Sequence, residues 1–560
     1  MALFGVETEY GLAAPGPEAD RRRNAAVAGE LVEEIRRWLP SLPAEGKAGA
    51  FVASEGFAGV VYLDRDHLEV ATNEADDPLD VVRFTLAGHC MVEQAIARRY
   101  PDPARRPTVF VSSVCLTNRV SFGCHENYLY RADASVSDPR DLLIPHLSTR
   151  TVFSGSGGLD PSPGVSFVIS PRALFLVVPR STSSMKGRGI ADDVEEPLRA
   201  TQYRRFHVLA GDPVLAEIPG YLKVGSTALV LELTQAGVCP RESVALADPV
   251  AAMHAIARDP SCRLEVALAN GGSASAVTIQ RRFLEAAQAH LDAPWMPTFA
   301  AAVCREWRRV LDMLDRDPAA ACTVLDWAIK REIFGRVLAR HQMDWTAMAA
   351  WTDALRALWA RLRPGDSPEA LPPPEVLLEP RARRRARAAG AVAVFKARGL
   401  AWTDLPRFLE CRRALFESDI RFGELSDKSL FRQLDRAGVL NHHVVGIDGL
   451  DIDRANAPPP ATGRARVRGE AIQRLAGGRP FICDWDRICD PSSGAWFDLT
   501  DPLDPAAQWR SANGKPIPGN APDPLPTPPP AEPAFMRRGR ESGSGALWAY
   551  LEDGPSAEGG

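Results

Sequence analysis

Acidic side chains are concentrated in two short stretches near the N-terminus. The first reads FGVETEYG over residues 4–11, and the second reads VYLDRDHLE over residues 61–69. Each is typical of a β-strand, in which successive side chains point to opposite faces, so Glu7 and Glu9 share one face. Mg²⁺ prefers carboxylate oxygens and leaves coordination positions open for phosphate. The pattern therefore predicts a sheet face that binds ATP and magnesium.

The second stretch adds residues with different possible roles. Tyr62 and Asp64 share a face of the predicted strand, and Glu69 follows five residues later. Glu7, Tyr62 and Glu69 could hold a metal ion. Asp64, ionised beside that ion, could deprotonate an incoming amine, orient a water molecule or attack a carbonyl. An isolated Tyr-x-Asp is usually an ordinary strand position, but the two acidic strands together favour a functional site.

Two further pairs of polar residues could bind a nucleotide. His125 and Asn127 follow a glycine turn at the start of a strand, and a phosphate or its metal ion would satisfy their polar atoms. A lone histidine of this kind is also common as a structural residue. Arg204 and Arg205 could neutralise a phosphate or a carboxylate, or they could form a pair on a surface strand.

Composition limits the classes of partner. The chain has 560 residues, 45% of them hydrophobic, and a formal net charge of −5. This balance gives no overall attraction to nucleic acid or to an anionic membrane. Neither a signal peptide nor a run of about 18 apolar residues is found, so a cytoplasmic protein is expected.

The pattern of the chain predicts a soluble α+β enzyme in several parts. Most strands are expected in the first two hundred residues, and amphipathic helices follow beyond residue 240. Expected strands lie near residues 3–10, 51–54, 59–64, 107–115, 126–131, 164–169, 173–178 and 206–210. Expected helices lie near residues 24–38, 78–99, 138–148, 246–258, 278–291, 300–315, 319–337, 344–362 and 406–438. The predicted parts are a large catalytic domain (1–455), a small C-terminal domain (456–503) and a disordered Pro/Gly-rich tail (504–560).

Residues 352–405 of the large domain are predicted to be an insertion. A proline-rich stretch there precedes a dense run of arginines, namely Arg381, Arg383, Arg384, Arg385 and Arg387. Such a run is usually one solvated face of a helix, and it could also be a docking patch for an acidic partner.

Several motifs, in order along the chain, together resemble one enzyme family. They are GVETEYG (5–11), YLD (62–64), GCHENYL (123–129), YRRFHV (203–208), LKVGSTALVL (222–231), RGE (468–470) and DW (484–485). The chain resembles the Pup ligase and depupylase/deamidase family, relatives of glutamine synthetase among the carboxylate-amine ligases. The resemblance implies a cradle-shaped antiparallel sheet backed by helices, with a small C-terminal domain closing one end.

The resemblance also implies cofactors and roles for matching positions. It implies ATP and Mg²⁺ as cofactors, with Glu7, Tyr62 and Glu69 binding the metal. It makes Asp64 the catalytic acid/base or nucleophile, and it places Thr72 and Trp485 against the nucleotide. An aromatic ring such as that of Trp485 can stack on adenine, although a tryptophan can also simply fill a core.

The family divides into two activities. One branch joins the terminal Glu side chain of the small protein modifier Pup to a substrate lysine, and the other cleaves that isopeptide bond or deamidates a terminal Gln of Pup. The short spacing from Asp64 to Glu69 and the stretches 77–80 and 255–261 resemble the cleaving branch. The long loop that this branch inserts before the catalytic strand is not evident in residues 12–58. The cleaving activity is therefore expected, with Pup ligation as the alternative.

Two further functions are also compatible with the sequence. A silent family member could bind the modifier without turnover, and a related ligase could act on glutamate-like small molecules. The expected partners are a Pup-like modifier and its lysine-linked conjugates, with a possible link to proteasomal degradation. Two positions depart from the family pattern: Val60 replaces a basic residue two positions before Tyr62, and residues 192–197 lack the family's arginine.

Overall fold

The computed structural model describes most of the chain. The described residues are 3–16, 21–54, 57–116, 120–132, 139–160, 165–182, 187–192, 202–366, 371–444, 447, 463–478, 480–503 and 508–517. Of the predicted disordered tail, only residues 508–517 fall within this set, and of the stretch 192–197 only Asp192 does.

A large sheet forms the centre of the molecule. In the described part of the chain its strand order is β12-β13-β14-β9-β1-β5-β4-β3-β2, and β6 also pairs with β1. Neighbouring strands are antiparallel, except that β12 and β13 are parallel. The strands are β1 (Phe4–Ala13), β2 (Ser41–Pro43), β3 (Ala48–Val52), β4 (Val60–Asp64), β5 (His67–Ala71), β6 (Thr108–Phe110), β9 (Cys124–Arg131), β12 (Val178–Ser181), β13 (Gly189–Asp192) and β14 (Tyr203–Val208).

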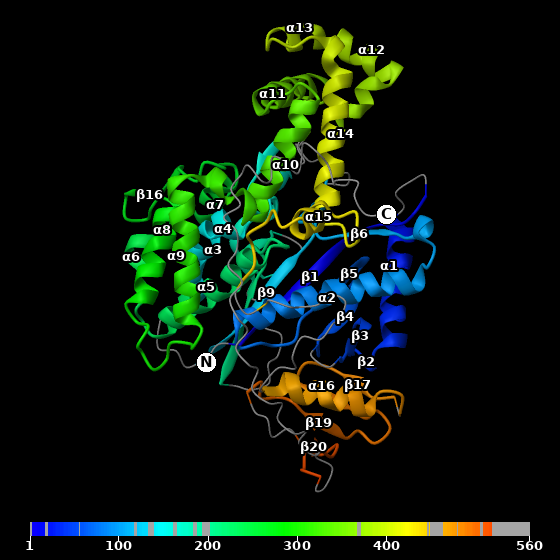
Figure 1. Cartoon of the computed structure of the whole chain (residues 1–560), viewed down its shortest axis with the longest axis vertical. Coiled ribbons are helices and arrows are strands. Elements are labelled where there is room, and N and C mark those ends of the chain that lie inside the picture. The colour runs from blue at the N-terminus through cyan, green and yellow to red at the C-terminus, as the bar shows by residue number, and fades with distance from the viewer. Residues whose placement is uncertain are drawn as a thin grey trace.

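Three helices cover one face of this sheet (Figure 1). They are α1 (Arg21–Trp38), α2 (Pro78–Arg99) and α5 (Glu217–Gln235). The face they cover carries the even-numbered residues of β1, as shown by the 2.8 Å hydrogen bond between Tyr10 and His89 of α2. Because side chains alternate along a strand, Glu7 and Glu9 point to the opposite face.

Further helices form a second layer and a projecting lobe (Figure 1). The helices beside the sheet are α3 (Pro139–Thr149), α4 (Thr151–Ser154), α6 (Arg241–Val244), α7 (Pro249–Ala257), α8 (Ala276–Gln288), α9 (Ala300–Arg316), α10 (Asp326–Arg340) and α15 (Leu430–Arg436). The lobe consists of α11 (Trp345–Leu362), α12 (Pro380–Ala388), α13 (Ala391–Lys396) and α14 (Leu405–Phe422), with the rings of Trp351 and Phe408 stacked 5.0 Å apart in its core. Within the described residues, none of the helices has the length and apolarity that a membrane span requires.

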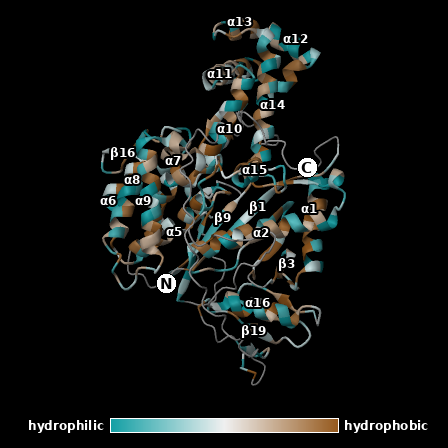
Figure 2. Ribbon diagram, in the orientation of Figure 1, coloured by the Kyte–Doolittle hydropathy of each residue, from teal (hydrophilic) through white to brown (hydrophobic). Residues whose placement is uncertain are grey.

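The C-terminal residues form a small helix-and-sheet unit against the edge of the large sheet (Figure 1). It contains α16 (Gly463–Leu475) and the strands β17 (Ile482–Cys483), β18 (Arg487–Cys489), β19 (Trp496–Asp498) and β20 (Trp509–Arg510). The last strand lies beyond residue 503, where the small domain was predicted to end. Figure 2 shows hydrophobic and hydrophilic segments along both α1 and α16, as expected for helices with one buried face.

The structure corrects three sequence-based expectations about elements. Residues 61–69 are not one strand but a hairpin of β4 and β5, in which Arg65 adopts a φ of 60° at the turn. The strand expected at residues 173–178 is a 3-10 helix (Arg172–Phe175) followed by β12. Helix α5 was not predicted, because its residues are buried on nearly all sides and show no amphipathic period. The predicted helix at 78–99 is confirmed as α2, where Asp77 caps the first turn through the amide of Leu79.

Candidate active site

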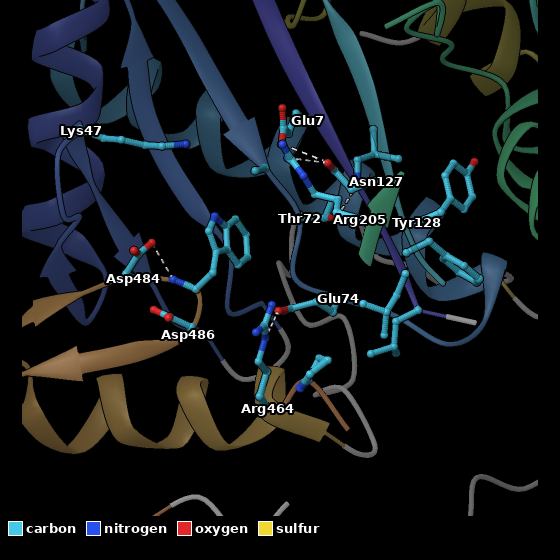
Figure 3. Close-up of a pocket in the computed structure, with 18 of the residues that line it drawn as sticks. Glu7, Lys47, Thr72, Glu74, Asn127, Tyr128, Arg205, Arg464, Asp484 and Asp486 are labelled. Atoms are coloured by element: carbon cyan, nitrogen blue, oxygen red, sulfur yellow. Dashed lines mark hydrogen bonds and ion pairs between the residues drawn. The ribbon is translucent and has the colours of Figure 1, made fainter. Parts of the chain in front are cut away.

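A cavity of about 340 Å³ opens between the uncovered face of the large sheet and the small C-terminal unit. Figure 3 shows the side chains that line it, from both parts of the chain. The sheet contributes Glu7, Thr72, Asn127 and Arg205, and the small unit contributes Trp485, among others. The cavity therefore lies on the face where the sequence predicted an ATP and magnesium platform.

A row of acidic groups crosses three neighbouring strands beside this cavity. Glu9 of β1 pairs with Glu69 of β5, and Glu69 pairs with Tyr62 of β4. Residues opposite each other across a sheet point to the same face, so these three side chains stand side by side. Asp64 ends β4 at the hairpin, where oxygens of Glu9, Asp64 and Glu69 all lie within 4.8 Å of one another.

The carboxylates of this acidic row repel one another. Burial, together with the negative charges of Glu7 and Glu9, raises the pKa of Glu69 well above its ordinary value. Burial also tends to raise the pKa of Glu9, but the hydrogen bond from His67 and the nearby positive charges lower it to about 2. In the absence of a cation, ionisation of Glu9 is thus favoured, whereas ionisation of Glu69 is opposed. A divalent cation would remove this conflict, because it lets all the carboxylates ionise.

A second group of potential ligands surrounds Glu7. Its Oε2 lies 3.5 Å from Nδ1 of His125 and 4.0 Å from Nε2 of His207, and the three residues form a cluster with metal-ligand spacing. The other ring nitrogen of His207 lies 3.0 Å from Oδ2 of Asp192. In metal sites, one nitrogen of a histidine ring commonly bonds a carboxylate. This bond orients the ring so that its second nitrogen faces the metal ion.

The residues present fit a bound cation. Nε2 of His207 is buried and has no hydrogen-bond partner among the described residues. A buried polar atom without a hydrogen-bond partner destabilises the folded state unless a ligand or an ion contacts it. The pKa of Glu7 is lowered by the hydrogen bond from His125 and by the charges of His207, His125 and Arg205, which outweigh the effect of burial. Glu7 is therefore ionised and able to serve as a ligand.

The remaining lining residues suit a nucleotide. The amide nitrogen of Asn127 donates to Glu7 at 3.0 Å, and Nη1 of Arg205 donates to Oδ1 of Asn127 at 2.9 Å. The hydroxyl oxygen of Thr72 accepts a 3.0 Å hydrogen bond from the amide of Val6, which fixes this side chain at the cavity wall. The ring of Trp485 packs edge-on against Phe51 at a centroid distance of 5.0 Å and keeps one side toward the cavity.

The structure brings most of the predicted residues together. Five of them line the cavity, namely Glu7, Thr72, Asn127, Arg205 and Trp485. Asp64 and Glu69 belong to the cluster with Glu9, and His125 belongs to the cluster with Glu7. Tyr62 lies beside Glu69. Arg204 is exposed and does not belong to the cavity lining. Its strand neighbour Arg205 takes the inward position, because adjacent residues of a strand face opposite ways.

Two residues of the site were missed by the sequence-based selection. Glu9 shares a face with Glu7, so the strand alternation already placed it in the same space. His207 belongs to the motif YRRFHV, but its role depends on Asp192, which lies on the adjacent strand β13. Only the sheet register brings that carboxylate to the imidazole.

Comparisons with known proteins identify related sequences. A family model described as Pup-ligase protein matches residues 2–368 and 393–489. A Pup deamidase/depupylase of Mycolicibacterium smegmatis is 36% identical over 293 residues, which is 51% of this chain and 58% of that protein. A Pup–protein ligase of Actinosynnema mirum is 30% identical over 492 residues, covering 86% of this chain and 92% of that protein.

Solved structures establish the fold. The crystal structure of the complex between the prokaryotic ubiquitin-like protein Pup and its ligase PafA matches with a TM-score of 0.65 and 23% identity, covering 90% of both chains. PafA in complex with ADP matches with a TM-score of 0.59 and 22% identity, over 90% of this chain and 92% of that one. The predicted α+β architecture, a helix-backed antiparallel sheet with a small C-terminal domain, is confirmed. The chain belongs to the Pup-ligase protein family.

Proposed function

We propose that this protein is an ATP- and Mg²⁺-dependent enzyme that acts on Pup. In the proposed reaction it cleaves the isopeptide bond between the modifier and a lysine, or deamidates the C-terminal Gln of the modifier. The observation that carries the proposal is the position of Asp64, which ends a strand at the open side of the acidic cluster. Its neighbours Glu9 and Glu69 are buried, whereas Asp64 is accessible to a substrate.

The residues of the site have different roles in the proposed reaction. Glu7, Tyr62 and Glu69 would hold magnesium, which supplies charge stabilisation when it is bound. Asp64 would attack the carbonyl of the isopeptide or amide bond, or remove a proton from a water that attacks it. Asn127 and Arg205 orient the polar groups next to Glu7, and Trp485 offers a flat surface for adenine. His67, whose pKa is raised by its hydrogen bond to Glu9, holds that carboxylate 3.2 Å away and leaves Asp64 available.

Ligation of Pup is the second candidate, and two observations favour it. The alignment with the Actinosynnema ligase covers most of both chains. Only seven residues separate the end of β1 from the start of α1, so the long loop expected of the cleaving branch is not inserted there. In a ligase, Asp64 would instead deprotonate the incoming lysine. A cytoplasmic location and a link to proteasomal degradation stay predictions from the sequence.

A gel assay distinguishes these activities. The protein is incubated with ATP, Mg²⁺, a Glu-ended Pup and a preformed Pup–protein conjugate, with a Gln-ended Pup in a parallel reaction. We expect wild type to consume the conjugate, and Asp64→Asn to lose turnover by at least about 100-fold, the usual weight of a positioned acid or base. Asp66→Asn, in the same turn but bonded to Arg21 on the surface, is the matched control and should remain active.

The remaining outcomes of this assay each have a definite meaning. New conjugates formed together with ADP would identify a ligase. Full activity of Asp64→Asn would remove Asp64 from the mechanism. A wild-type protein that binds Pup and leaves every substrate unchanged would be a silent regulator.

A further inference from the structure

Lys47 lies at the mouth of the cavity and belongs to none of the motifs described above. It ends the tight turn between β2 and β3, where Gly46 adopts a φ of 68° that favours glycine. The side chain is exposed and lines the cavity. Figure 3 shows it extending toward Glu7 from the wall opposite Arg205. Two cations therefore face each other across the space beside the acidic groups.

The neighbouring backbone makes room for this side chain. Gly49 pairs with Tyr62, and a Cβ on this glycine would meet the Cβ of Tyr62 at 2.4 Å. Because Gly49 has no side chain, the ring of Tyr62 is uncovered on that side. The ammonium of Lys47 lies over this ring, 4.0 Å from its centroid. A ring face attracts a cation without neutralising it, so the charge remains available to an anion.

The other cations of the cavity are already engaged. Arg464 bonds Glu74 at 2.6 Å, and Arg205 bonds Asn127. Lys47 has neither a hydrogen bond nor an ion pair from its ammonium to any described residue. Val60 adds a second observation: it stands two residues before Tyr62, where the resembling family has a basic residue, and it is apolar and fully buried. The cavity thus lacks a cation at the family position and has one on the adjacent loop.

We propose that Lys47 binds the phosphate chain of the nucleotide and takes the place of the basic residue missing at position 60. The inference rests on the proposed function, because it requires that the cavity takes a nucleoside di- or triphosphate. The ammonium is a compact charge with three donors, which suits non-bridging phosphate oxygens. With adenine against Trp485, the phosphate chain would lie on the side of the cavity that Lys47 lines.

Binding affinities test this assignment without reference to activity. Calorimetric titrations of ATP, ADP and adenosine are compared for wild type, Lys47→Met and Lys47→Arg. We expect Lys47→Met to weaken ATP and ADP about tenfold, the weight of one charged hydrogen bond, with adenosine unchanged. Lys47→Arg should keep most of the affinity, because it restores the charge. Lys428→Met, at an exposed lysine in the turn before α15, is the matched control and should bind all three as wild type does.

The possible failures are distinguishable. Wild-type ATP affinity in Lys47→Met would overturn the role of Lys47 and leave the proposed function standing. An equal loss for adenosine would show that Lys47 shapes the base site and would also overturn the assignment. Failure of the wild-type protein to bind ATP at all would overturn both this inference and the ATP dependence on which it rests. Thermal melting of each variant confirms that the exposed substitution leaves the fold intact.

Discussion

Glu69 is the residue on which the behaviour of the acidic row depends. It is 3% exposed, stands between Tyr62 and Glu9, and its pKa is raised well above normal by burial and by the charges of Glu7 and Glu9. Without a cation, its pKa therefore favours the protonated form more than that of an ordinary glutamate does. Its deprotonation and the binding of a metal ion are coupled, since a ligand must be ionised to coordinate.

Glu69→Gln tests this coupling. Glutamine mimics the protonated acid, so we expect the metal-free variant at pH 7.5 to be at least as stable as wild type. Mg²⁺ at 100 times its Kd should stabilise wild type by about 2.7 kcal/mol and should not stabilise the variant. Thermal melting with and without Mg²⁺, followed by its removal with a chelator, measures both effects.

The matched control for this experiment is Glu33→Gln on the surface of α1, where Glu33 pairs with Arg36. It should keep the full response to Mg²⁺. A wild-type magnesium response in Glu69→Gln would show that Glu69 is not a ligand.

At the level of single residues, strand alternation is readable from the sequence, whereas contacts between distant strands are not. Alternation places Glu7 with Glu9 and Tyr62 with Asp64 on common faces, whereas Glu69 comes beside Tyr62 only through the pairing of β4 with β5. The partner of His207 could not be selected, because Asp192 and His207 meet only through the pairing of β13 with β14. A contact between side chains on two paired strands depends on the register of that pairing, and the local sequence pattern does not determine the register.

At the level of elements, an ion cluster ties the segment after α15 to the start of α5. The two ring nitrogens of His443 lie 3.0 Å from Oε1 of Glu217 and 3.1 Å from Oδ1 of Asp435. Hydrogen bonds to these two carboxylates raise the pKa of His443 to about 10. His442 also bonds Asp435, at 3.0 Å. A doubly hydrogen-bonded imidazolium therefore links the two helices.

This cluster predicts a pH-dependent stability. The folded pKa of His443 is above its ordinary value of 6.5, so its contribution is complete below about pH 6.5 and is lost as the pH rises toward 10. Because His443 is half exposed, solvent screening limits the contribution to about 1 kcal/mol. His443→Ala should thus lower the free energy of unfolding by about that amount at pH 6 and have little effect at pH 10, as measured by urea denaturation. A loss of equal size at both pH values would contradict an electrostatic link.

Elements with a clear surface pattern were predictable, and buried ones were not. The limits of α2 followed from Asp77 and Pro78 at its start and from its apolar stripe. Helix α5 has buried residues along almost its whole length, so its sequence has no polar face to reveal a helical period. The β4–β5 hairpin was hidden for a different reason, since its two-residue turn uses Arg65 and Asp66 in place of the usual glycine or asparagine.

At the scale of the whole molecule, one partly buried carboxylate, that of Glu74, joins the two domains. Glu74 lies after β5 and bonds Arg468 of α16 at 2.5 Å and Arg464 at 2.6 Å. Arg468 is fully buried, and its guanidinium lies 4.8 Å from the centroid of the Trp485 ring. The pKa of Glu74 is lowered because the two arginines outweigh the effect of burial. These ion pairs therefore link the two domains and help to position one wall of the cavity.

Glu74→Ala should separate the roles of two interdomain ion pairs. Removing Glu74 leaves a buried guanidinium without its charge partner, and we expect a loss of about 3–5 kcal/mol in the free energy of unfolding, together with weaker ATP binding. Glu45→Ala breaks the more exposed pair with Arg487 and should cost less than about 1 kcal/mol. Denaturant unfolding and ATP titration of both variants provide the comparison. Equal losses in the free energy of unfolding would contradict the larger contribution assigned to Glu74.

The contact between the two domains also protects the large sheet from other chains. Strand β2 is the outermost strand at its end of the sheet, and beside it the amide of Glu45 donates to the carbonyl of Cys483 at 2.9 Å. Leu42, Phe51 and Val60 pack there against Val467 and Ile472 of the small unit. Without that cover, an open strand edge flanked by apolar side chains would be a template for pairing with a second molecule. The C-terminal domain thus covers an edge that could otherwise promote aggregation, in addition to forming a wall of the cavity.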